Sequence, residues 1–178
     1  MSDLKIKFEK DFRLFLSKTL LKQLKNCLEN ARPYEACGII FGDVKEIKNH
    51  NSNYIYIYEG YNFACIQSDF ESTVSFLIEN IEKLHEIIQI KMKNLKIEDR
   101  KRLVSIFHSH PSGAYPSSKD LNQMKFLDSF SRLSQSFVSK AFKNLIWLIM
   151  DGTNYDLNGF IYLNSEFFQI AVEVKENM

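Results

Sequence analysis

The chain has 178 residues, which suits one domain, because a single core of this size removes roughly 70% of the unfolded chain's surface from water. A hydrophobic fraction of 45% and a charged fraction of 25% exclude a disordered or fibrous chain. The net charge of +1 excludes broad electrostatic attraction to nucleic acid or to an anionic membrane. We therefore expect neither partner, and the composition leaves the oligomeric state open.

The N-terminal residues are charged and lack the apolar run of a signal peptide. No stretch of the sequence approaches the roughly 18 apolar residues of a membrane span, so the expected location is the cytoplasm. Cys27, Cys37 and Cys65 form no C-x-x-C pair, so we expect buried free thiols. The alternative is a nucleophilic Cys37 partnered by His108 or His110, but apolar surroundings would raise the pKa of this thiol.

The first elements are expected from residue 12 onward. Residues 1–11 are predicted to be an N-terminal extension, residues 12–178 to form the domain, and residues 12–16 to form a short strand. Ser17 or Thr19 could cap a helix that ends before a proline. The apolar residues of this helix recur at three- and four-residue spacing: Leu20, Leu21, Leu24, Cys27 and Leu28.

Strands and one long helix are predicted in the middle of the chain. Residues 36–42 are apolar with two glycines, which indicates a buried strand with Glu35 at its head. Aromatic and β-branched residues predict further strands at 54–58 and around Phe63. An apolar stripe from residue 72 to residue 93 predicts the longest helix. We expect a packed or partly exposed helix residue at His85, a loop residue at His50 in its polar stretch, and no metal at either.

The last third of the chain alternates between the two kinds of element. A strand at residues 103–107 runs into His108, and a helix is expected to begin near Ser117 or Ser118. Turn signals then separate three strands, at residues 145–150, 159–163 and 167–174. The predicted fold class is mixed α/β (α+β), one domain with a mixed sheet flanked by helices.

Three residues after the strand at 103–107 have the character of metal ligands. Side chains two apart on a strand point to the same face, so His108 and His110 can present their imidazoles to one point. Catalytic zinc usually takes three protein ligands and leaves one position to water. Asp120 is the natural third donor, because the loop containing Pro111 and Pro116 would bring the next helix back to the histidines.

Hydrolysis of an amide also needs a general base and an oxyanion donor. Glu35 can serve as the base and later as the acid if the sheet places its strand beside His108. Ser117 lies one helical turn before Asp120, where its hydroxyl could stabilise an oxyanion. Ser117-x-x-Asp120 is also similar to a capping box, in which the pair merely satisfies free N–H groups at the start of a helix. The clustering of all these features favours a metal site.

These residues resemble the signature of the JAMM or MPN+ metalloproteases, a Glu on an early strand followed by H-x-H-P, a loop and S-x-x-D. The matching segments are Glu35-Ala-Cys-Gly, His108-Ser-His-Pro and Ser117-Ser-Lys-Asp120. The resemblance implies an α-β-α MPN domain with one Zn²⁺ held by His108, His110 and Asp120. It further implies that Glu35 is the acid–base group and Ser117 the oxyanion donor.

The loop after His110 departs from the family pattern, because six residues precede Ser117 where the family usually has seven. Ser118 could therefore take the place of Ser117. Through the resemblance, the expected substrates are isopeptide or peptide bonds at the C-terminus of ubiquitin-like or small sulfur-carrier proteins. Their extended tail could add as a strand to an exposed sheet edge. The alternatives are a metal-dependent peptidase or amidase acting on small substrates, and a non-catalytic MPN scaffold that binds protein partners.

Overall fold

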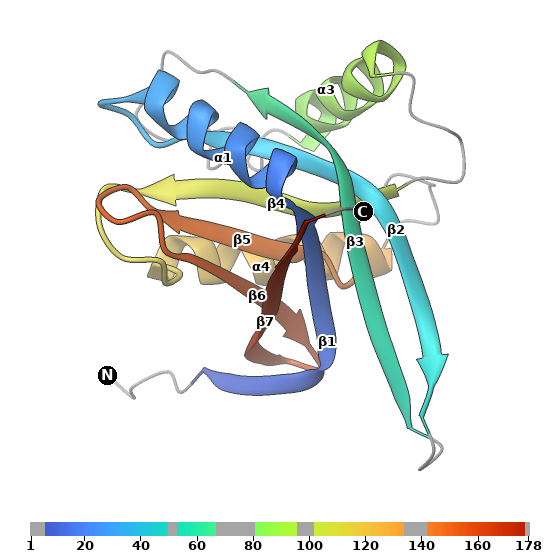
Figure 1. Cartoon of the computed structure of the whole chain (residues 1–178). Helices are drawn as coiled ribbons and strands as arrows, with labels where there is room; N and C mark the ends of the chain where they lie inside the picture. The colour runs from blue at the N-terminus through green and yellow to red at the C-terminus, as the bar shows by residue number, and fades with distance from the viewer. Residues whose placement is uncertain (1–5, 50–52, 67–80, 96–101, 134–141, 177–178) are drawn as a thin grey trace.

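A computed structural model describes residues 6–49, 53–66, 81–95, 102–133 and 142–176. Its strands form a closed barrel in the order β1-β3-β2-β4-β5-β6-β7 (Figure 1). The β1–β3, β1–β7 and β4–β5 pairs are parallel and the others are antiparallel, so the sheet is mixed as predicted. The strands are β1 (Lys7–Ser17), β2 (Cys37–Lys48), β3 (Tyr54–Ile66), β4 (Arg102–His110), β5 (Ile146–Asp151), β6 (Leu157–Leu163) and β7 (Glu166–Lys175). The helices are α1 (Lys18–Ala31), α3 (Ile81–Asn94) and α4 (Ser118–Leu133).

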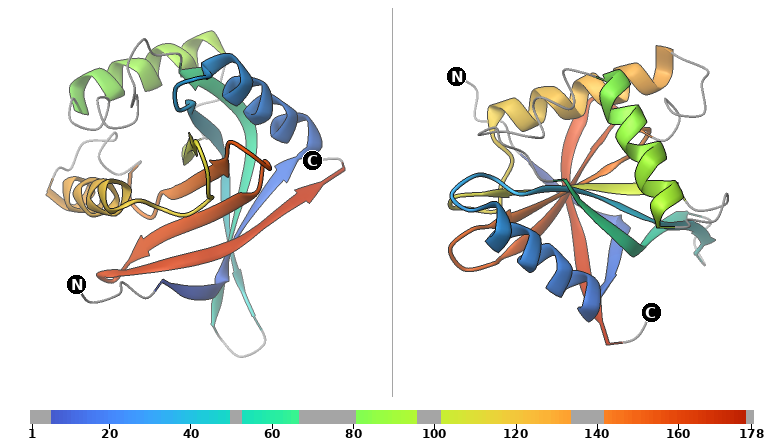
Figure 2. Two further views of the ribbon diagram at one scale, coloured as in Figure 1. Left: turned by 90° about the vertical axis from the view of Figure 1, so that its left-hand side faces the viewer. Right: turned by 90° about the horizontal axis from the view of Figure 1, so that it is seen from above.

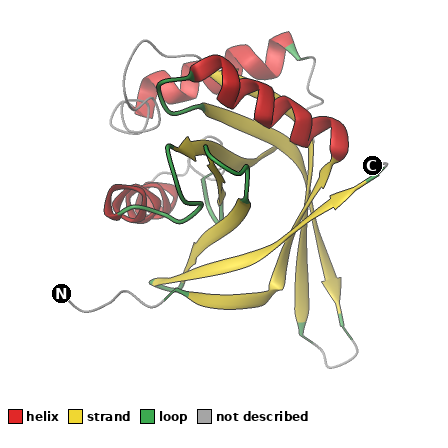
Figure 3. Ribbon diagram, turned by 60° about the vertical axis from the view of Figure 1, so that its left-hand side comes forward, coloured by secondary structure: helices red, strands yellow, loops and turns green. Residues whose placement is uncertain are grey.

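The helices cover the two faces of this curved sheet. Alternate residues of one strand point to opposite faces, so the strands contribute to two separate apolar clusters. Trp147 and Ile149 of β5 join the cluster that includes residues of α3 and α4, whereas Leu148 joins the cluster that includes α1. Figures 2 and 3 show α1 and α4 on different sides of the strands. The predicted arrangement of a mixed sheet flanked by helices is therefore confirmed. No described helix has both the length and the apolar character needed to cross a bilayer.

The N-terminal strand is longer than the sequence pattern predicted. β1 begins at Lys7 and so includes residues that were expected to belong to the extension. Its first residues pair with β7, with Lys7 opposite Phe168, and this pairing closes the barrel. The hydroxyl of Ser17 accepts a hydrogen bond from the Leu20 N–H at 3.1 Å, so Ser17 caps α1.

β2 and β3 form a long hairpin that extends beyond the rest of the barrel in Figure 1. The two strands expected at residues 54–58 and around Phe63 are one continuous strand, β3. The register shifts between Phe41 and Gly42, where a β-bulge brings Gly42 opposite Gly60. A Cβ at Gly42 would lie 1.7 Å from the carbonyl oxygen of Glu59, so this close approach of two strands requires glycine.

α3 contains the C-terminal part of the predicted long helix. The remainder of that prediction, up to residue 80, lies outside the described residues, as does His50. His85 lies on α3, whose Leu84 and Ile88 are buried in the apolar cluster. The periodicity therefore identified the face by which this helix packs on the sheet.

The prediction of three free thiols is wrong for two of the cysteines. Cys27 of α1 and Cys65 of β3 form a disulfide, with their Cα atoms 5.8 Å apart, while Cys37 is free and buried. The two bonded residues are 38 positions apart in the sequence. They meet only because α1 packs across β3, and the cysteine spacing gave no sign of this packing.

Candidate metal centre

Two of the predicted ligands lie at the C-terminal end of β4. His108 and His110 are two positions apart on this strand, so the pleat directs both imidazoles to the same side. His108 is 1% exposed, and its ring makes an edge-to-face contact with Trp147. His110 is partly exposed, and it also forms a hydrogen bond with the backbone of Tyr115. The buried packing of His108 and the backbone bond of His110 restrict the orientations of the two rings.

Asp120 reaches the histidines from the first turn of α4. Ser117 precedes the helix, and its N–H and hydroxyl each donate to Oδ2 of Asp120 at 2.6 Å. The Asp120 N–H donates in return to the Ser117 hydroxyl at 3.3 Å. The pair is thus a capping box. The capping and metal-site interpretations are compatible, because this cap holds the Asp120 carboxylate against the two imidazoles.

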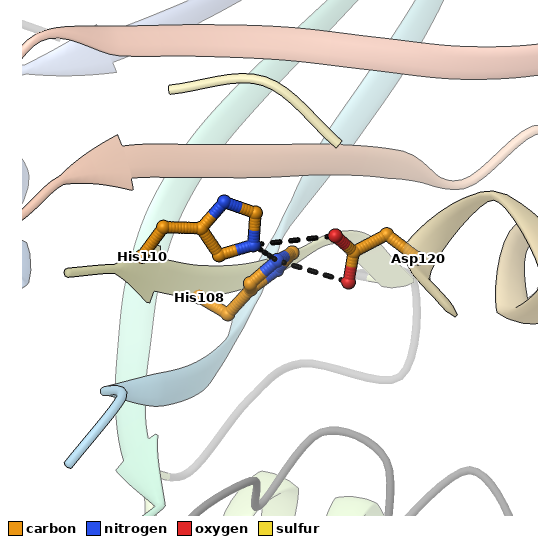
Figure 4. Close-up of side chains that lie close together, drawn as sticks. All are labelled: His108, His110 and Asp120. Atoms are coloured by element: carbon orange, nitrogen blue, oxygen red, sulfur yellow. Dashed lines mark hydrogen bonds and ion pairs between the residues drawn. The ribbon is translucent and has the colours of Figure 1, made fainter. Parts of the chain in front are cut away.

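The three donors converge on a small volume (Figure 4). Nε2 of His108 lies 3.0 Å from Nε2 of His110. The Asp120 carboxylate lies 3.2 Å from each ring, through Oδ1 to His108 and Oδ2 to His110. Ligands bound tetrahedrally to zinc at about 2.0–2.2 Å are separated by roughly 3.3 Å, so the three residues fit such an ion. In the described part of the chain they are the group of side chains that could hold a metal.

The electrostatics of this group also suit a cation. Burial alone would raise the pKa of the Asp120 carboxyl, but hydrogen bonds from His108 and His110 outweigh burial and hold that pKa well below its ordinary range. The hydrogen bond to Asp120 raises the pKa of His110 above its ordinary value, although burial opposes the shift. A carboxylate that stays ionised between two imidazoles is the form in which it binds a metal.

The β2–β4 pairing brings Glu35 to the same place. Cys37 is paired with His108, so the chain immediately before β2 runs beside the end of β4. Burial raises the pKa of the Glu35 carboxyl; the charge of Asp120 adds to this effect, while His108 and His110 oppose it. Glu35 therefore lies within electrostatic range of all three predicted ligands, as its position at the head of a strand beside His108 required.

Ser109 is a residue of this site that the sequence did not reveal. Its hydroxyl accepts a hydrogen bond from the Ala36 N–H at 2.8 Å, and its own N–H donates to the Ala36 carbonyl at 3.0 Å. These two bonds fix the residue that follows Glu35 against the residue between the two histidines. The position of this serine between the two histidines of the motif was the available signal for its role, but its partner lies 73 positions away in the sequence.

The shorter loop does not prevent Ser117 from reaching the site. Ser117 contacts Asp120 directly, whereas Ser118 is the first residue of α4. In this structure the Ser117 hydroxyl is engaged with Asp120. It lies beside the candidate metal ligands, where a hydroxyl can also approach a polarised substrate oxygen.

Comparison with known proteins agrees with this geometry. Residues 17–156 match the family described as prokaryotic homologs of the JAB domain. The chain therefore belongs to this family, and the resemblance inferred from the motifs is confirmed. The wider JAB/MPN group includes metal-dependent isopeptidases as well as non-catalytic members. No curated protein matches the chain.

Solved structures are similar over almost the whole chain. The solution structure of protein DSY2949 from Desulfitobacterium hafniense is 17% identical with a TM-score of 0.57, covering 93% of this chain and 94% of its own. A JAB1/MPN domain protein from Archaeoglobus fulgidus is 18% identical, covers 92% and 98% respectively, and has a TM-score of 0.43. A Salinibacter ruber protein is 16% identical, covers 91% and 92%, and has a TM-score of 0.46. At 17% identity the Desulfitobacterium hafniense structure supports the fold alone.

Proposed function

We propose that the protein is a zinc-dependent peptidase that hydrolyses isopeptide or peptide bonds at the C-terminus of ubiquitin-like or small sulfur-carrier proteins. The observation that carries the proposal is the convergence of His108, His110 and Asp120 donor atoms within 4.8 Å of one another beside a half-buried Glu35. When bound by these three side chains, Zn²⁺ supplies a Lewis acid and lowers the pKa of water to about 7. The cytoplasmic location stays a prediction.

Each remaining side chain has a role that follows from its surroundings. Glu35 accepts a proton from the attacking water and delivers it to the leaving amine, and burial favours its protonated form between the two transfers. Ser117 donates its hydroxyl to the substrate oxygen that becomes negative. The Asp120 carboxylate keeps the hydrogen bond from the Ser117 N–H when the hydroxyl turns to the substrate, and it stays charged throughout.

An open cavity beside His110 offers space for the substrate. Its volume is about 580 Å³, within the range of roughly 300–1,000 Å³ typical of binding sites. It lies between the C-terminal end of α1, the end of β4 and the β5–β6 turn, and its walls include Pro33, Tyr34 and Pro111. An extended protein tail with small residues could enter this space, which supports a protein C-terminus as the substrate.

The test uses zinc-loaded protein and a ubiquitin-like protein joined through its C-terminal glycine to a lysine-containing peptide. We expect about one zinc per chain, cleavage that a chelator abolishes, and a loss of about 10²-fold or more in turnover for Glu35→Gln with zinc retained. Glu46→Gln, an exposed change on the β2–β3 hairpin, is the matched control. Unchanged turnover in Glu35→Gln contradicts the proposal, and cleavage of short peptides alone favours the small-substrate alternative. A protein that binds no zinc supports the scaffold alternative.

A further inference from the structure

Asp151, at the end of β5, contacts the loop between the predicted ligands as well as its own turn. Its Oδ1 accepts hydrogen bonds from the N–H and hydroxyl of Thr153, at 2.7 and 2.6 Å. Its Oδ2 accepts a hydrogen bond from the Gly113 N–H at 2.7 Å, 38 positions away in the sequence. Local turns of the Asp-x-Thr kind explain the first two bonds, but they do not explain the third.

Gly113 belongs to the ligand loop, which we define as residues 111–117, between His110 and α4. The loop is anchored at further points on the same side. The Gly152 N–H donates to the His110 carbonyl at 2.8 Å. Asn158 of β6 donates through Nδ2 to the Ala114 carbonyl at 3.1 Å, and Ala114 is buried. The β5–β6 hairpin thus bonds to the carbonyl of His110 and to two backbone groups of the loop, the Gly113 N–H and the Ala114 carbonyl.

The anchoring of this loop affects the position of Asp120 relative to the two histidines. Asp120 is carried by α4, and the ligand loop is the covalent connection between that helix and His110. The loop includes Gly113 with a φ of 82°, a conformation that other residues rarely adopt. Because the loop leads directly into the Ser117–Asp120 cap, a displacement of the loop would move the cap relative to the imidazoles. The donor atoms are only 3.0–3.2 Å apart, so a shift of a fraction of an ångström would already change the geometry of the site.

We propose that Asp151 and Asn158 are positioning residues that hold the ligand loop, and through it Asp120, at the separation from His108 and His110 that a bound Zn²⁺ requires. This inference rests on the proposed metal centre. Neither residue touches the metal ligands' donor atoms; both act on the loop backbone. Groups that orient metal ligands typically change metal affinity by about 10–100-fold when they are removed.

Asp151→Asn separates the bond that this carboxylate accepts from Gly113 of the loop from the bonds that it accepts from Thr153 of its own turn. The amide oxygen of asparagine can keep the bonds to Thr153, but its NH₂ group would then face the Gly113 N–H, and two donors cannot bond to each other. Asn158→Leu, of similar size, removes the donor to Ala114. Asp156→Asn is the matched control, because Asp156 is an exposed carboxylate of the same β5–β6 turn whose side chain bonds Asn154.

The experiment measures the zinc dissociation constant by chelator competition, at a temperature where circular dichroism shows every variant fully folded. We expect binding weaker by about 10–100-fold in Asp151→Asn and in Asn158→Leu, and unchanged in Asp156→Asn. The absorption bands of Co²⁺ in the same site should shift in the two positioning variants, which a loss of stability alone would not cause. If one of the variants fails to fold, the other carries the test.

The outcomes separate this inference from the proposed function. Zinc binding by the wild type with equal affinity in both positioning variants overturns the inference and leaves the proposed function standing. A wild-type protein without zinc affinity overturns both. Weaker binding with altered Co²⁺ bands supports the role of the β5–β6 hairpin, whatever substrate the protein cleaves.

Discussion

At the scale of single residues, the Cys37 thiol is fully enclosed within the sheet. Burial raises the pKa of Cys37 to about 12, and the nearby Glu35 charge adds to the effect. Since the thiolate is the reactive form, we expect no modification of Cys37 by iodoacetamide in the folded protein near pH 8, and complete modification after denaturation. Peptide mass analysis of the two samples checks this. Rapid labelling of the folded protein would revive the alternative in which Cys37 is a nucleophile.

The hydrogen-bonded carboxylate of Asp151 should make the free energy of unfolding depend on pH in the acid range. Its hydrogen bonds from Thr153 and Gly113 lower the pKa of Asp151 to about 2, below the ordinary value near 3.9. A lowered folded pKa stabilises the protein above the unfolded value, and this contribution is lost as pH falls towards 2. The excess in the free energy of unfolding of the wild type over Asp151→Asn should therefore be fully present at about pH 5 and above, and it should shrink as pH falls through about 3.

Urea denaturation of the metal-free proteins at several pH values measures this difference. A gap that stays constant with pH would contradict the assignment of the charged carboxylate as the acceptor of these hydrogen bonds. The wild type and Asp151→Asn share every other titratable group, so shared acid effects cancel in the comparison.

The candidate ligands could be predicted from the sequence because their placement depends on local rules. Two histidines on one strand share a face, and a Ser-x-x-Asp pair at a helix start points its carboxylate back along the chain. Ser109 and Asp151 could not be predicted in this way. Their partners are the backbones of Ala36 and Gly113, which only the folded sheet brings near them.

At the scale of elements, the disulfide between α1 and β3 should make the thermal stability of the protein depend on whether a reductant is present. It links residues 38 positions apart, and cross-links of this kind typically stabilise by about 2–4 kcal/mol, mainly by restricting the unfolded chain. We expect a reductant to lower the thermal midpoint of the wild type. The double variant Cys27→Ser, Cys65→Ser should already have the lower midpoint and should not respond to reductant. An unreduced intact mass that corresponds to three free thiols would contradict the bond.

The β-bulge in the long hairpin leads to a further prediction for Gly42→Ala. The added methyl group would collide with the Glu59 carbonyl oxygen, a backbone atom that cannot move without disturbing the β2–β3 pairing. We expect a loss of about 1–3 kcal/mol in the free energy of unfolding, measured by urea denaturation. Lys48→Ala, an exposed change on the same strand, should alter it by less than about 0.5 kcal/mol. Equal stability of the two variants would contradict the close approach of the strands.

Periodicity and turn residues predicted the type of most of the described elements, but not how the sheet closes. The continuous apolar run at residues 145–150 and the helical stripe that includes Leu84 and Ile88 are local signals. The parallel pairing of β1 with β7 joins the two ends of the described chain, and no short segment encodes it. The same limit explains why the start of β1 and the single long β3 were missed.

At the scale of the whole molecule, the candidate metal centre lies where the sheet meets helix α4. His108 and His110 belong to the central sheet, whereas Asp120 belongs to α4, which is packed on one face of that sheet. An ion bound to all three would cross-link these parts in the folded state only, because the unfolded chain does not hold the ligands together. Zinc binding should therefore stabilise the whole domain.

The expected effect is large enough to measure. With free zinc at about 100 times its dissociation constant, the stabilisation is about 2.7 kcal/mol, which for a chain of this length raises the thermal midpoint by roughly 5–11 °C. Chelator-treated protein is titrated with zinc while the midpoint is followed by circular dichroism. Asp120→Asn weakens the third ligand and should lose most of the shift, whereas Asp156→Asn should keep it. A wild-type midpoint that does not respond to zinc would mean that α4 and the sheet are joined by packing and the capping box alone, without an ion between them.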